Sequence, residues 1–230
     1  HGATDPKNLI RIMPAEGDVT DRLCVVLTGG SGAPTIPLPR PDLVIAADSG
    51  LHLAAALGLR VDLVVGDFDS ARPDAVAAAV TAGADLESHP ADKDATDLDL
   101  ALEAAARRGA TRTIVVGGAG NDRIDHVIAN SGVIAAQRHV GVGPEWWVGP
   151  ARVWPVRDHR TITGRAGDTV SIIPIAGEVV VSTTGLRWPL HHHALEFGSS
   201  RGVSNQMTAA TATVEVHSGV ALVAHLEEVS

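Results

Sequence analysis

Two aspartates, Asp67 and Asp69, come directly after an apolar run in the stretch LVVGDFDS at 63–70. Carboxylates this close together repel each other unless a positive charge lies between them. Mg²⁺, a hard cation that prefers oxygen ligands, is one group that would supply that charge. Asp-x-Asp pairs also occur in turns and helix caps, so this stretch alone does not distinguish a metal site from a turn.

Three further stretches carry acidic or basic side chains of a similar kind. They are ADSG at 47–50, DKDATD at 92–97 and RIDH at 123–126, which follows the glycine-rich GGAGND. Each by itself also fits an ordinary turn or helix start. Together they offer carboxylates for a cation and positive side chains for phosphate oxygens, the residue types that metal-assisted phosphoryl transfer uses. The residues concerned are Asp48, Lys93, Asp94, Asp97, Arg123 and Asp125.

The elements that would position these side chains alternate along the first two thirds of the chain. Apolar, β-branched runs predict strands at 23–28, 42–47, 61–65 and 113–116, and LESHP at 86–90 is a candidate short strand. Alanine-rich stretches predict helices at 50–58, 73–82, 97–108 and 124–136. This alternation predicts a parallel sheet with helices on both faces. Most of the motifs follow the carboxyl end of a strand, where open α/β sheets bind ligands.

From about residue 161 the pattern changes to short apolar runs separated by glycine-containing turns, such as TVSIIPI, ATVEV and ALVAHL. This pattern predicts an all-β region, a small sandwich. The mixed stretch 137–160 is interpreted as the end of the first domain plus a connection. The fold class predicted is α/β, with an N-terminal extension at 1–22, a parallel-sheet nucleotide-binding domain at 23–150 and a β-sandwich domain at 151–230.

Composition limits the partners of the chain. A formal net charge of −9 argues against a general nucleic-acid surface or an anionic membrane surface. No apolar stretch approaches the roughly 20 residues of a membrane span, and the first residues lack the apolar block of a signal peptide. The single cysteine, Cys24, is expected to be a buried small hydrophobe, and this cysteine usage suits a reducing compartment such as the cytoplasm.

The motifs in this order resemble the thiamine pyrophosphokinase family. The likeness spans about residues 23 to 226 and includes TTGLRWPL at 183–190 and GVSN at 202–205 in the β-rich part. It implies transfer of a pyrophosphoryl group from ATP, the co-substrate, to the hydroxyl of thiamine, with Mg²⁺ as cofactor and AMP as the second product. It also implies a homodimer that holds thiamine between the α/β domain of one subunit and the β domain of the other.

The resemblance assigns roles by motif position. Asp67, Asp69 and Asp97 would bind Mg²⁺, with Asp94 close to the metal. Arg123 and Asp125 would lie at the reacting phosphates, where Lys93 adds positive charge.

The remaining roles concern thiamine. Asp48 would lie beside it, Trp188 would pack on its rings, and Ser204 and Asn205 would line the same pocket. An indole face suits the thiazolium cation.

Two features depart from the family pattern or invite another interpretation. Ser49 stands where the family usually has glycine, and because serine adopts positive φ less easily, we expect an altered turn. The three histidines at 191–193 are expected to form a solvated turn rather than a metal site.

Three alternative functions remain open from the sequence. A pyrophosphokinase acting on a hydroxymethyl pterin would use similar aspartates. A metal-dependent glycosyltransferase would use Asp-x-Asp on a sugar nucleotide, and a binding module would use the same pocket without turnover.

Overall fold

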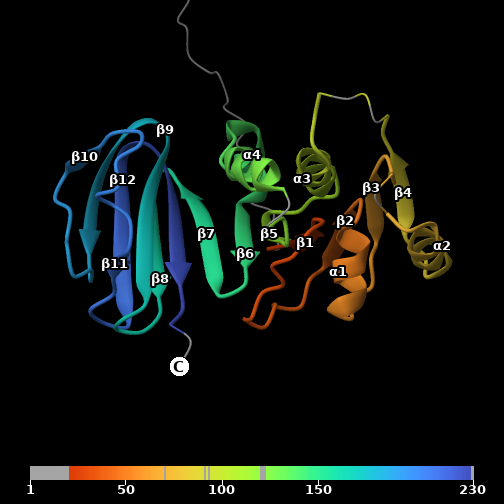
Figure 1. Ribbon diagram of the computed structural model, residues 1–230, viewed down its shortest axis with the longest axis horizontal. Helices are drawn as coiled ribbons and strands as arrows, with labels where there is room; N and C mark the ends of the chain where they lie inside the picture. Colours follow the sequence, from red (N-terminus) through yellow and green to blue (C-terminus); the bar gives the residue numbers. More distant parts are fainter. Residues whose placement is uncertain (1–20, 70, 91, 93, 120–122, 229–230) are drawn as a thin grey trace, which may run out of the picture.

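The computed structural model describes residues 21–228 except 70, 91, 93 and 120–122. Nearly all of the predicted N-terminal extension, 1–22, therefore lies outside the described residues, and so does Lys93. The described residues form a mixed α/β fold around one large sheet of strand order β10-β9-β12-β7-β6-β5-β1-β2-β3-β4 (Figure 1). Among these residues no helix is both long and apolar enough to span a bilayer.

Six strands at one side of this sheet are parallel, as the alternating pattern predicts. They are β1 (Leu23–Leu27), β2 (Leu43–Ala47), β3 (Leu63–Gly66), β4 (Asp85–Ser88), β5 (Arg112–Val116) and β6 (Pro144–Val148). The helices between them are α1 (Gly50–Ala56), α2 (Pro73–Thr81), α3 (Asp97–Arg107) and α4 (Ile124–Ile134), followed by the 3₁₀ helix η1 (Gln137–Val142). The chain passes from β1 to β2, β3 and β4 on one side and then returns to β5 on the other side of β1. The crevice between β1 and β5 is therefore the topological switch point, the usual ligand position in such sheets.

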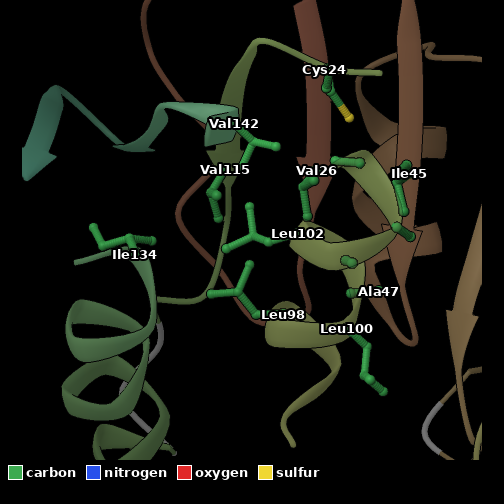
Figure 2. Close-up of a cluster of buried hydrophobic side chains, with 14 of the residues drawn as sticks. Cys24, Val26, Ile45, Ala47, Leu98, Leu100, Leu102, Val115, Ile134 and Val142 are labelled. Atoms are coloured by element: carbon green, nitrogen blue, oxygen red, sulfur yellow. The ribbon is translucent and has the colours of Figure 1, made fainter. Parts of the chain in front are cut away.

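β1, β2, β3 and β5 are buried on both faces, which explains their continuous apolar sequences, whereas the edge strand β4 is largely exposed. On one face, Leu98 and Leu102 of α3 pack between Val26 and Val115 (Figure 2). Cys24 belongs to the same cluster and is fully buried. Burial raises the pKa of its thiol to about 12, so Cys24 is an uncharged core side chain, as predicted.

The stretch 137–160 is more regular than the interpretation as a connection suggests. It contains η1, β6, β7 (Ala151–Val156) and the first residues of β8 (His159–Thr163). β6 pairs in parallel with β5, and β7 pairs antiparallel with both β6 and β12, so the sheet continues through this stretch. The strand pattern is hidden because Pro144 and Pro155 lie within the strands, where proline is uncommon.

The last third is all-β in the described residues, as predicted from the glycine-separated runs. Two 16-residue strands, β9 (Thr169–Thr184) and β12 (Thr211–Leu226), pair along most of their length, with register shifts between Val216 and Ala221. Both halves of each strand contribute to one buried cluster, together with β10 (His193–Leu195). The short β11 (Asn205–Gln206) pairs with β9. The predicted sandwich core is therefore enclosed by strands of one continuous sheet, and the division into two domains stays a prediction.

A buried acid and a buried histidine join the two ends of this β-rich part. Asp168 and His225 are 1% and 0% exposed, and Asp168 Oδ2 lies 2.9 Å from His225 Nε2. The backbone N–H groups of Glu228 and Arg165 also donate to the carboxylate. Burial alone would raise the pKa of Asp168, but these hydrogen bonds lower it below its ordinary value.

We expect Asp168→Asn to lower the free energy of unfolding by about 2–4 kcal/mol at pH 7, because it removes the buried carboxylate that His225 and two backbone N–H groups contact. The folded-state pKa of Asp168 lies below the unfolded value of about 3.9, so its contribution is complete above that pH and is lost as the pH falls through the folded-state pKa. Urea unfolding at pH 7 and pH 3 measures the difference. A gap between wild type and variant that stays constant with pH would contradict this account.

Candidate active site

Three carboxylates converge at the carboxyl edge of the parallel strands. Asp48 follows β2, and Asp67 and Asp69 follow β3; one carboxylate oxygen from each lies within 4.8 Å of the others. Within the described part of the chain this is the one group of three or more acidic, histidine or cysteine ligands close enough to hold a metal ion. The donor set consists of oxygens alone, which suits a hard cation such as Mg²⁺.

The backbone around these carboxylates adopts positive φ values that residues other than glycine rarely adopt. Asp48 has φ 46° and Phe68 has φ 62°, both in the left-handed region. The Asp48 N–H donates to Val65 O at 2.9 Å, and the Asp69 N–H donates to Asp67 Oδ1 at 3.2 Å. Such conformations persist only where surrounding structure holds them, and they cluster at functional sites.

Asp97, the first residue of α3, lies next to this group. A Cβ on Gly66 would stand 3.2 Å from Asp48 Cβ and 3.3 Å from Asp97 Oδ1, so glycine leaves just enough room for both side chains. The N-cap residue Thr96 accepts from the Asp99 N–H and begins the helix there. Asp48 therefore groups with Asp67 and Asp69, and Asp97, which the family resemblance adds to the metal ligands, stands beside them. Asp94 is exposed in the bend before α3.

A cavity of about 430 Å³ opens beside the carboxylates, a volume typical of small-molecule sites. Asp48, Asp97 and Arg123 line it. Two loops line a further part of its wall: 28–31 after β1, which sequence reasoning did not single out, and 118–119 after β5, which belong to the glycine-rich stretch before RIDH. A Cβ on Gly117 would come within 2.5 Å of Thr28 O, so the two loops approach as closely as glycine permits. The stretch TGGSG was recognisable, because it follows a predicted strand as the acidic motifs do.

The basic side of the cavity comes from the start of α4. Arg123 is the N-cap residue, and its Nη2 lies 3.0 Å from Asp125 Oδ2. The Arg123 hydrogen bond lowers the pKa of Asp125 to about 2, so both side chains stay charged at neutral pH. Arg123 and His126 line the cavity and contact each other, whereas Asp125 points outward and is 64% exposed.

Two further polar residues in the cavity wall, Ser49 and Asn130, were not predicted as site residues. Ser49 has φ −62°, an ordinary right-handed value that serine adopts without strain. Its Oγ fills the space beside Gly29, where a Cβ would stand only 2.0 Å away. Asn130 is 96% buried one turn after His126, and its side chain lies against Gly118. Both place polar atoms at the switch-point crevice.

Apart from Asp48, the residues predicted to contact thiamine lie in the β-rich part and do not line this cavity. Trp188 is 55% exposed, and the Arg187 guanidinium stacks 4.9 Å from its ring centre. Asn205 is buried and uses its amide to hold the loop: its Oδ1 accepts from the Trp188 N–H, and its Nδ2 donates to Trp188 O. Ser204 has φ 58° and donates its N–H to Ser171 Oγ. Asn205 is therefore built to position Trp188.

The histidine triplet does not form a three-ligand group with other described residues. His191 and His192 are exposed in the turn before β10, and His193 is the first residue of that strand. The His192 ring lies against the His217 ring at a tilt of 37°, with 4.4 Å between ring centres. An exposed turn agrees with the prediction for this segment.

Comparison with known proteins links both parts of the chain to one family. Residues 38–142 match the family model "Thiamin pyrophosphokinase, catalytic domain", and residues 158–221 match "Thiamin pyrophosphokinase, vitamin B1 binding domain". Among solved structures, thiamine pyrophosphokinase from Bacillus subtilis is similar with a TM-score of 0.79 and 20% identity, covering 90% of this chain and 100% of that chain. A thiamin pyrophosphokinase family protein from Enterococcus faecalis has a TM-score of 0.78 and 22% identity, again covering 90% of this chain and 100% of that chain. Yeast thiamin pyrophosphokinase has a TM-score of 0.71 and 12% identity, covering 90% of this chain and 87% of that chain.

Proposed function

The chain belongs to the thiamin pyrophosphokinase family, and on that basis we propose that it transfers a pyrophosphoryl group from ATP to the hydroxyl of thiamine, giving thiamine diphosphate and AMP. The observation that carries the proposal is the position of the carboxylate group of Asp48, Asp67 and Asp69. It stands beside a cavity that Arg123 lines, inside the segment that matches the catalytic domain.

The three carboxylates fit Mg²⁺, which we propose as the cofactor. Asp48, Asp67 and Asp69 would hold it, with Asp97 adjacent; when bound, it offsets the negative charge of phosphate oxygens. The chain's own residues would bind and position the nucleotide. Gly29, Gly30 and Gly118 let the backbone approach the nucleotide closely, and Arg123 binds the oxygens of the transferred group. Positioning of this kind supplies most of the catalysis in phosphoryl transfer.

The products of the reaction test this function directly. Purified protein with Mg²⁺, ATP and thiamine should release AMP and thiamine diphosphate in equal amounts. Release of ADP, or turnover with a hydroxymethyl pterin but not with thiamine, would contradict the assignment. Mg²⁺ omission should abolish the signal, and readdition should restore it.

We propose that the protein works as a homodimer. Trp188 follows β9, which is five strand positions from β1 in the sheet order, or about 24 Å at the usual strand spacing. Trp188 and the cavity therefore stand far apart within one chain. Exposed apolar side chains occur near both, Phe197 on the β-rich part and Ile124 and Ile128 on α4, and such side chains often mark interfaces. A second copy would bring the two halves together. A sedimentation mass of a single chain during turnover would contradict this.

We also propose that the chain divides near residue 150 into an α/β nucleotide-binding domain and a β-rich thiamine-binding domain. The separate family matches support this division, and so does one buried cluster made up only of residues from Trp154 onward. Amide hydrogen exchange should then show two groups of strands that differ in protection, with the change near β6 and β7. Equal protection across all strands of the sheet would contradict the division.

The cysteine usage supports a cytoplasmic location, which fractionation of the source cells can test.

Trp188→Ala is expected to weaken thiamine binding about 10–100-fold and to leave the affinity for a non-hydrolysable ATP analogue unchanged. The indole is exposed and available to a cationic ring, and its loss removes cation–π and stacking contacts. Calorimetry with each ligand measures both affinities. Ile173→Ala, which truncates an exposed apolar side chain of β9 in the same β-rich part, is the matched control. An equal loss of affinity for thiamine and for the ATP analogue in Trp188→Ala would indicate that the tryptophan has a structural role instead.

A further inference from the structure

A second cavity, of about 510 Å³, lies at the opposite edge of the parallel strands from the candidate active site. It is lined by residues at the amino-terminal ends of β5 and β6, by the end of β7 and by the start of β8. The active-site cavity lies at the carboxyl ends of β1, β2 and β5. Because a five-residue strand is about 16 Å long, the two cavities are separate sites.

Three arginines, Arg112, Arg157 and Arg160, line this second cavity, and each is partly buried. Arg112 Nε donates to Glu145 Oε1 at 2.7 Å, and Arg157 Nη2 donates to the carbonyl of Ala135. Arg160 is different: within the described residues its guanidinium has no hydrogen bond or ion pair, and its Nε is buried without a partner. The guanidinium instead stacks 4.2 Å from the ring centre of Trp154.

The nearest carboxylate does not neutralise Arg160 because it is already engaged. Glu145 is 6% exposed, and besides Arg112 it accepts from the indole N–H groups of Trp147 and Trp154 at 3.1 and 2.9 Å. Burial lowers the pKa of the Arg160 guanidinium; Glu145 opposes this shift, whereas Arg112 and Arg152 add to it. The two other acids that line the cavity, Asp21 and Asp158, are exposed at its rim.

The inner part of the cavity is therefore cationic. A partly buried guanidinium without a counter-ion is unfavourable, and an anion that enters the cavity relieves this cost. Guanidinium groups match the oxygens of phosphate in a planar, two-point arrangement. The cavity volume also leaves room for more than a single phosphate group.

We propose that this cavity is a second, non-catalytic binding site for a phosphate or diphosphate group, free or attached to a small organic molecule, and that Arg160 is its main ligand. Arg157 lines the same cavity and adds a second cation. The site is independent of the proposed catalytic function, since it shares no residue with the active-site cavity.

Calorimetric titration of the full chain with pyrophosphate, in metal-free buffer so that the aspartate group repels anions, tests the proposal. Wild type should bind one equivalent at this site, and Arg160→Gln should weaken that binding about tenfold or more, because a charged hydrogen-bond partner is lost. Arg152→Gln is the matched control: Arg152 also stacks on a tryptophan, 5.0 Å from the Trp147 ring centre, but it does not line the cavity. It should bind pyrophosphate nearly as wild type does.

Parallel titrations with inorganic phosphate and with AMP distinguish a free anion from an organic phosphate ester by which of them binds more tightly. Arg160→Lys keeps the charge but not the two-point geometry and should fall between wild type and Arg160→Gln, which guards against a folding defect in the glutamine variant. No binding by wild type, or equal binding by wild type and Arg160→Gln, would each overturn the proposal.

Discussion

Replacing Asp69 with asparagine is expected to lower kcat by about 10²–10³-fold and to change the free energy of unfolding by no more than about 0.5 kcal/mol. The carboxylate of Asp69 belongs to the group with Asp48 and Asp67, and the side chain is exposed rather than packed in the core. The substitution keeps the shape and removes the charge that a hard cation needs. Steady-state AMP release over a Mg²⁺ titration, together with urea unfolding, measures both quantities.

Asp74→Asn is the control for this variant. Asp74 is also an exposed aspartate, but it pairs with Arg72 at the start of α2 and does not line the cavity. It should keep wild-type turnover. If Asp69→Asn retained full activity, or lost activity only in step with a loss of stability, the role of this carboxylate group in metal binding would be wrong.

The convergence of the acidic motifs was predictable because parallel strands place their carboxyl ends at one edge. That rule required only strand positions, and the strands at 23–27, 43–47, 63–66 and 112–116 lie where the apolar runs predict them. The grouping of Asp48 with Asp67 and Asp69 was not predictable in the same way. It depends on the left-handed backbone of Asp48, which aspartate tolerates but which no sequence pattern requires.

The pairing of the strands in 144–156 and the role of Asn205 could not be predicted from the sequence, for different physical reasons. The strand pairing of 144–156 depends on neighbours distant in sequence, β5 on one side and β12 on the other, and proline within these strands obscures the local pattern. The role of Asn205 is also a matter of tertiary contacts, since its amide binds the backbone of Trp188, 17 residues away. The fold class could be predicted from local sequence patterns. The arrangement of side chains within the site could not, because it depends on contacts between residues that are distant in the sequence.

Arg123→Gln is expected to lower kcat by about 10²–10³-fold with a smaller change in KM. Arg123 lines the cavity at the start of α4, and a positive charge there stabilises phosphate oxygens most strongly as charge moves onto them in the transition state. Arg123→Lys should recover part of the rate, because lysine keeps the charge but loses the planar fork. Rapid-quench measurement of a single turnover separates this chemical step from product release.

The chain provides a close structural control for this arginine. Arg72 is the N-cap residue of α2 and pairs with Asp74 two residues later, as Arg123 caps α4 and pairs with Asp125. Arg72→Gln therefore removes an arginine from the same helix position and the same local ion pair, but at a helix that does not border the cavity. If both variants lost activity equally, the effect of Arg123 would come from the ion pair at the start of the helix. Loss in Arg123→Gln alone would assign the effect to its position beside the carboxylate group, where the transferred phosphates must lie.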